Sequence, residues 1–82
     1  MNFPAKFCGI KKFVSSKGAV YGDVYAFGLD AEGGQDFEQI KIRTFKKEVV
    51  SACERLKSGD SIFLELTVKD ALLEGVTKYE ED

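Results

Sequence analysis

Basic and aromatic side chains alternate along the stretch "QIKIRTF", residues 39–45. Lys41, Arg43 and Phe45 are two positions apart, so in an extended strand they lie on one face, about 7 Å from each other. Cations attract phosphate groups, and a flat ring offers a surface on which a nucleobase stacks. The pattern therefore predicts a surface that binds single-stranded nucleic acid by charge and stacking.

Simpler structural explanations exist for the same residues. Lys and Arg are common on the solvated face of a half-buried strand, and Ile40 and Ile42 supply the apolar face here. A Phe at the end of a strand can also close an apolar core. The two explanations differ in whether the Phe45 ring is exposed.

Residues of the same two kinds extend the predicted path in both directions along the chain. Lys46 and Lys47 stand at the start of a predicted helix, where positive charge opposes the helix dipole unless an anion lies near. The full set of predicted nucleic-acid-binding residues is Lys11, Lys12, Phe13, Lys17, Tyr21, Tyr25, Phe37, Lys41, Arg43, Phe45 and Lys46.

Charge is segregated along the chain. The 82 residues contain 12 Lys and Arg against 14 Asp and Glu, a formal charge of −2. Residues 1–57 carry ten basic against seven acidic side chains, whereas residues 58–82 carry two against seven. A basic front half with an acidic end indicates a polyanionic partner, although an ordinary dipolar surface explains it equally well.

Several classes of chemistry lack the residues that they need. The chain has no His, and Cys8 and Cys53 are far apart, which excludes the usual zinc-ligand spacings and His-based catalysis. The acidic residues of the 30–36 loop match no metal-binding spacing, and "EGG" lacks the Lys-Ser/Thr of a phosphate-binding loop. We expect no enzymatic activity, no cofactor and no metal.

The length predicts one domain, residues 1–79, followed by a short acidic tail at 80–82. Because such a small core gives modest stability, we expect a homodimer or homotetramer. No apolar run is long enough to cross a membrane, and no signal-peptide pattern is present. Together with two cysteines expected to be reduced, this predicts a cytoplasmic protein.

The hydrophobic periodicity predicts the elements that position these residues. Alternation indicates strands at 5–14, with a bulge or bend at Gly9, and at 20–29, joined by a turn at 15–19. Further strands are expected at 37–45, 60–70 and 71–79. Helical spacing begins after Phe45, with Lys57 in the last turn and Gly59 just beyond. This order suits a mainly β fold, a five-stranded Greek-key barrel of the OB-fold type with its helix between strands three and four.

The segment "IKIRTFKKEVVSACERLKSGDSIFLEL" resembles the bacterial and phage single-stranded DNA-binding protein family, and "GDVYAFGL" is similar to that family's second strand. The resemblance covers roughly residues 5–70 and implies a short phage- or mobile-element-type member that coats DNA in replication or recombination. It implies stacking by Phe45 and a basic role for Lys41. Gln39 stands where the family often has a stacking Trp, so that role would pass to Phe37, Tyr21 or Tyr25.

A protein-interaction module is the alternative from another class. In that case the sheet edges would pair with a larger assembly and the acidic end would meet a basic partner. Salt-sensitive binding to oligonucleotides separates the two hypotheses. Single-stranded DNA is the expected ligand, and RNA is a further one.

Overall fold

The computed structural model of the chain describes residues 2–29, 35–67, 70 and 72–78, with residues 35–38 described for the backbone alone. Within these residues the fold is mainly β, with five strands and one helix. The elements are β1 (Asn2–Val14), β2 (Val20–Leu29), β3 (Gln35–Thr44), α1 (Lys47–Glu54), β4 (Ser61–Leu66) and β5 (Leu73–Lys78). The predicted order of strands and helix is confirmed, while the predicted acidic tail lies outside the described residues.

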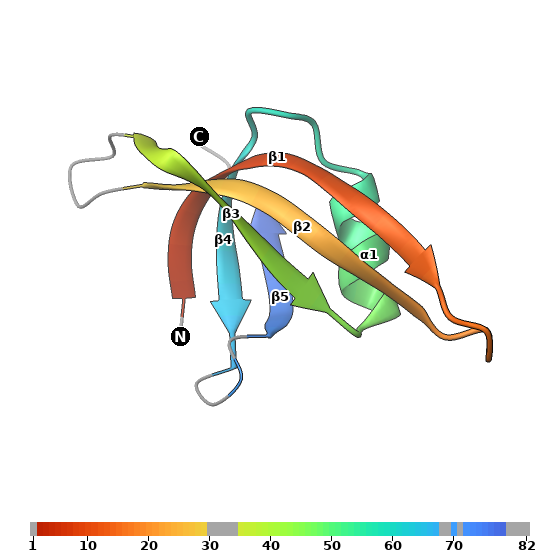
Figure 1. The fold of residues 1–82 in the computed structure, drawn as a ribbon. Helices are drawn as coiled ribbons and strands as arrows, with labels where there is room; N and C mark the ends of the chain where they lie inside the picture. Colours follow the sequence, from red (N-terminus) through yellow and green to blue (C-terminus); the bar gives the residue numbers. More distant parts are fainter. Residues whose placement is uncertain (1, 30–34, 68–69, 71, 79–82) are drawn as a thin grey trace.

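The strands form a single antiparallel sheet in the order β3-β2-β1-β4-β5. Figure 1 shows β1, β2 and β3 as one curved layer that crosses over β4 and β5. The two edge strands, β3 and β5, approach each other but share no hydrogen-bonded ladder in the described part of the chain. The sheet is therefore curved but not closed, and the closure expected of a barrel is not seen.

The central strand β1 belongs to both halves of the sheet. Its first residues pair with β4 (Asn2 with Glu65), and its longer part pairs with β2 as far as Val14 with Val20. The register with β2 shifts between Phe7 and Gly9 and leaves Cys8 without a β2 partner, next to the glycine at which a bulge or bend was predicted. Because a bulge bends a strand and increases its twist, it lets β1 turn from one partner to the other.

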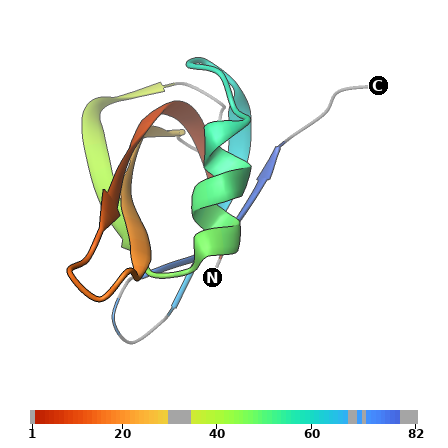
Figure 2. The same ribbon diagram turned by 90° about the vertical axis from the view of Figure 1, so that its right-hand side faces the viewer.

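The core lies between the inner face of the curved sheet and the helix. Val24 and Ala26 of β2 and Ile42 of β3 face inward, and Val49 and Cys53 of α1 pack against this cluster. Figure 2 shows α1 running alongside the ribbons of β1 and β2. The alternation predicted for residues 20–29 and 37–45 is confirmed where the side chains are described: Val24, Ala26 and Ile42 are buried, and their neighbours in sequence form an outer face on which Asp23 is also buried.

The helix is shorter than its hydrophobic spacing predicts. It ends at Glu54 with Arg55 as its C-cap, so the prediction that Lys57 lies in the last turn is wrong. Residues beyond it bond to β1 instead, since the Gly59 amide donates to the Phe7 carbonyl at 2.7 Å and the Phe7 amide donates to the Asp60 carbonyl at 2.9 Å. Gly59 does adopt the predicted left-handed backbone, with φ at 96°, but in this later turn.

Strand β4 is also shorter than predicted, because it ends at Leu66 rather than continuing to residue 70. Thr67 begins a turn in which its amide donates to the Leu72 carbonyl and its hydroxyl accepts from the Leu72 amide. No helix in the described residues has the length and hydropathy needed to span a membrane.

Candidate nucleic-acid interface

Three aromatic rings, from Phe13, Tyr21 and Phe45, gather at one end of the outer face of β1, β2 and β3. We call them the ring row. Phe13 and Tyr21 are directly paired across β1 and β2, and their rings stack with centroids 5.1 Å apart and planes 17° apart. The Phe45 ring is tilted against Tyr21 at 5.9 Å. Phe45 is 60% exposed, so the explanation that it closes the core is wrong.

The local backbone explains why the Phe45 ring lies outside. Thr44, its neighbour in β3, is fully buried, and its hydroxyl accepts a hydrogen bond from the Lys46 amide at 3.2 Å. The Lys46 carbonyl in turn accepts from the amides of Val49 and Val50 in the first turn of α1. These hydrogen bonds fix the backbone on both sides of Phe45, at the end of β3 and at the start of α1. Its side chain is left in solvent.

A charged row lies directly beside the ring row. Lys11, Asp23 and Arg43 occupy paired positions across β1, β2 and β3. Arg43 donates to Asp23 twice, from Nε at 2.9 Å and from Nη2 at 3.2 Å. Its guanidinium lies over the Tyr21 ring at 5.2 Å and the Phe13 ring at 5.9 Å, and Lys11 Nζ lies 5.5 Å from the Phe13 ring. Rings and cations therefore form one continuous cluster.

Asp23 is the one acidic side chain of this row, and its carboxylate is only 6% exposed. The hydrogen bonds from Arg43 hold the pKa of Asp23 below its ordinary value, against the opposing effect of burial. The carboxylate therefore stays ionised at neutral pH and neutralises the guanidinium. No buried side-chain nitrogen or oxygen in the described residues lacks a partner.

The next row along the outer face pairs Tyr25 with Lys41. Lys41 is exposed and has no ion-pair partner among the described residues, in contrast to Arg43 two positions later. Tyr25 is half-buried on the same face. This row adds a free cation and a further ring next to the charged row.

The remaining predicted residues fall in different places. Lys17 is exposed in the turn between β1 and β2, and Lys46 is exposed and follows Phe45 in the chain. Lys12 points to the opposite side, where its Nζ lies 3.7 Å from Glu54 of α1. The Phe37 side chain lies outside the described residues.

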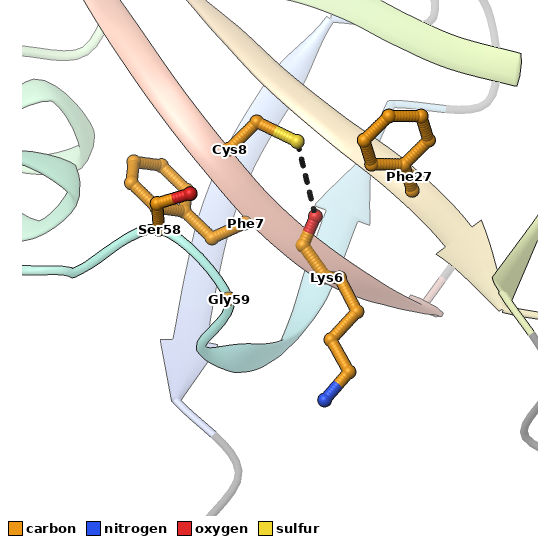
Figure 3. A pocket seen from close by; sticks show the side chains of 6 residues that line it. All are labelled: Lys6, Phe7, Cys8, Phe27, Ser58 and Gly59. Atoms are coloured by element: carbon orange, nitrogen blue, oxygen red, sulfur yellow. Dashed lines mark hydrogen bonds between the residues drawn. The ribbon is translucent and has the colours of Figure 1, made fainter.

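A hollow at the other end of the outer face contains residues that the sequence did not single out for nucleic-acid binding. It is lined by Lys6, Phe7, Cys8, Phe27, Ser58 and Gly59 (Figure 3). Phe27 pairs with Lys6 across β1 and β2, and Lys6 Nζ donates to the Ser61 hydroxyl at 3.0 Å. The Phe27–Lys6 pair places a ring beside a cation, as at the other end of the face. This pair could not be predicted without knowing the register of β1 with β2.

The two cysteines differ in environment. Cys8 lines this hollow and is half-buried, with its Sγ 3.9 Å from the Lys6 carbonyl (Figure 3). Cys53 is buried in the core, and this burial raises the pKa of its thiol to about 11. Both cysteines are free thiols.

The comparisons with protein-family models, with curated proteins and with solved structures give no match to this chain. The geometry of the outer face is thus the basis for a functional proposal.

Proposed function

We propose that this protein binds single-stranded DNA without general sequence selectivity and so coats it, as in replication or recombination. The observation that carries the proposal is the ring row, in which Phe45 is exposed and Phe13 and Tyr21 are half-buried, flanked by cations on the outer face of a sheet whose inner face is filled by the core. A base that stacks on these rings removes apolar surface from water, which is favourable. No core residue has to move for a base to reach the rings.

Stacking supplies one part of the proposed affinity. A base stacked on an aromatic side chain is worth about 1–3 kcal/mol by alanine substitution, and every base has a face to offer. Phe45, the most exposed ring of the ring row, is the leading candidate, with Tyr21 beside it and Tyr25 farther along the same face. A duplex keeps its bases stacked on each other, so the surface should prefer single strands.

The exposed lysines supply the phosphate contacts. Lys11 and Lys41 lie on the same outer face as the ring row, and the exposed Lys17 and Lys46 are close to it in the chain, so a strand stacked there would pass within reach of several ammonium groups. Each neutralised phosphate releases counterions, which makes the affinity fall with salt. Lys12 faces the helix and is left out of this path.

The fold supports an assignment to the OB-fold class. An OB-fold is a partly open five-stranded Greek-key barrel that binds oligonucleotides on the face of strands two and three and at the loop between strands one and two. The order β3-β2-β1-β4-β5, with β3 near β5, suits that arrangement. We accordingly propose a relative of the single-stranded DNA-binding proteins, a homodimer or homotetramer acting in the cytoplasm of a bacterium or a phage-infected cell.

The direct test is fluorescence anisotropy of a labelled oligo-dT, titrated with the protein at low salt and again at about 0.3 M salt, where fewer counterions are released. We expect binding that weakens with salt and exceeds binding to a matched duplex. An oligo-U strand measured alongside shows whether RNA shares the surface. Equal affinity for duplex and single strand would remove the stacking mechanism, and no binding at low salt would remove the function.

The open edges of the sheet favour one second candidate, a protein-interaction module. Strands β3 and β5 each have one edge without a ladder in the described residues, and such edges can pair with a strand from another protein. In this case the protein would bind no oligonucleotide at low salt.

A further inference from the structure

Arg43 differs from the other cations of the outer face because it is already neutralised. Its guanidinium makes a two-point contact with the Asp23 carboxylate, which is 6% exposed, whereas the Arg43 side chain itself is 45% exposed. A cation that only has to attract phosphates gains nothing from a buried counter-charge. Lys41, with no such partner among the described residues, is suited to that task.

The contact with Asp23 leaves the other side of the guanidinium available. Arginine has five N–H donors, and Asp23 uses one on Nε and one on Nη2. Nη1 has no hydrogen-bond partner among the described residues, so two donors on Nη1 and one on Nη2 remain. These groups form the planar fork that matches two acceptors on one edge of a ligand.

The orientation of that fork is fixed by its surroundings. Asp23 holds one side of it, and the rings of Tyr21 and Phe13 lie 5.2 and 5.9 Å from the guanidinium carbon. A fork held in this way loses little side-chain entropy when it binds. The Phe45 ring lies 5.9 Å from Tyr21, so bases stacked along the ring row adjoin the guanidinium.

We infer that Arg43, positioned by Asp23, binds the O6/N7 edge of a guanine base in the bound strand. Guanine is the base that presents two acceptors on this edge, and Arg bonded to O6 and N7 is its commonest specific contact. Adenine presents a donor beside N7, and thymine presents one acceptor beside a methyl group. The inference rests on the proposed function and adds a preference at one position of an otherwise unselective path.

The test is a competition assay in which unlabelled strands displace a labelled oligo-dT from the protein. The competitors are oligo-dT and the same strand with one central dG, one central 7-deaza-dG or one central dA. We expect the dG strand to bind about fivefold to a hundredfold tighter than oligo-dT, and the dA and 7-deaza-dG strands to lose most of that gain. Equal affinity for the dG and oligo-dT strands would overturn the inference, as would equal affinity for dG and 7-deaza-dG.

Variants separate base reading from simple charge. Arg43→Lys keeps the charge but replaces the planar fork by a flexible ammonium group, so the preference for dG should fall well below that of the wild type. Arg55→Lys is the matched control, because Arg55 lies at the C-cap of α1, and it should keep the full preference. Asp23→Asn leaves an unneutralised cation, so we expect a weaker dG preference together with a steeper dependence on salt. An Arg43→Lys protein that prefers dG as strongly as the wild type does would contradict the assignment.

Failure of this inference is distinguishable from failure of the proposed function. Salt-sensitive binding of oligo-dT with no preference for dG would leave the single-strand path intact and remove the role of Arg43. If none of the strands binds, both proposals fail. Because the strand comparison uses the wild-type protein, the result does not depend on any variant folding.

Discussion

The two faces of β2 and β3 are built from alternate residues of the same strands, yet one face packs in the core and the other faces solvent. On the inner face Val24, Ala26 and Ile42 are buried against the helix. On the outer face Tyr21 and Phe45 remain accessible, and Asp23, the one buried carboxylate among the side chains that the structure describes, is held by Arg43. Residues that stabilise the fold therefore alternate with residues proposed to bind DNA. Substitutions one residue apart should change either the free energy of unfolding or the affinity for DNA, but not both.

The largest expected effect is on the inner face. Ile42→Ala removes a side chain packed in the core, and such truncations cost about 2–5 kcal/mol because they also leave a cavity. The free energy of unfolding, measured in urea, should fall by this amount. A loss below about 0.5 kcal/mol would mean that this face of β3 is not core, since that is the range of ordinary surface substitutions.

The next effect is on the outer face at the ring row. Phe45→Ala should weaken binding to oligo-dT by about 1–3 kcal/mol, because it removes a stacking surface. Since the ring is 60% exposed, the free energy of unfolding should stay close to that of the wild type. A variant that unfolds would instead make Phe45 a core residue and end the comparison between the two faces.

The Asp23–Arg43 pair should make stability depend on acid. The pKa of Asp23 is lowered in the folded protein by the hydrogen bonds from Arg43, so its contribution is complete above about pH 4, the ordinary value. As the pH falls below that value toward the folded pKa, the contribution is progressively lost. The difference in unfolding free energy between the wild type and Asp23→Asn should therefore shrink as the pH falls below about 4. A difference that does not change with pH would mean that the pair contributes nothing to stability.

The smallest effect distinguishes two lysines on opposite faces. Lys41→Gln should lower the slope of log affinity against log salt by about 0.7, the value for one phosphate contact on a single strand. Lys12→Gln is the control, because Lys12 pairs with Glu54 on the helix side and should leave the slope unchanged. If Lys12→Gln lowered the slope as much, the DNA path would not be confined to the outer face.

Alternation in the sequence predicts which residues share a face, because consecutive residues of a strand point to opposite sides. That is why Lys41, Arg43 and Phe45 are found together and why Val24 and Ala26 are buried. The same rule should have separated Lys12 from its neighbours Lys11 and Phe13.

Register is what the sequence cannot supply. Asp23 meets Arg43, and Lys6 meets Phe27, only because of how β2 pairs with its two neighbours. Register across the 30–36 loop does not follow from composition, since several alignments keep the apolar face buried. The end of α1 was mispredicted for a related reason: the segment around Gly59 bonds to Phe7, a partner distant in the chain.

Whether DNA binds to the outer face of the sheet is tested by an NMR titration of ¹⁵N-labelled protein with oligo-dT. If the outer face of β1, β2 and β3 is the DNA path, the amide signals of Phe13, Tyr21, Lys41 and Phe45 should shift together as the strand is added. The signals of β4 and β5 should change little. Shifts confined to β4 and β5, or no shifts at all, would contradict the account.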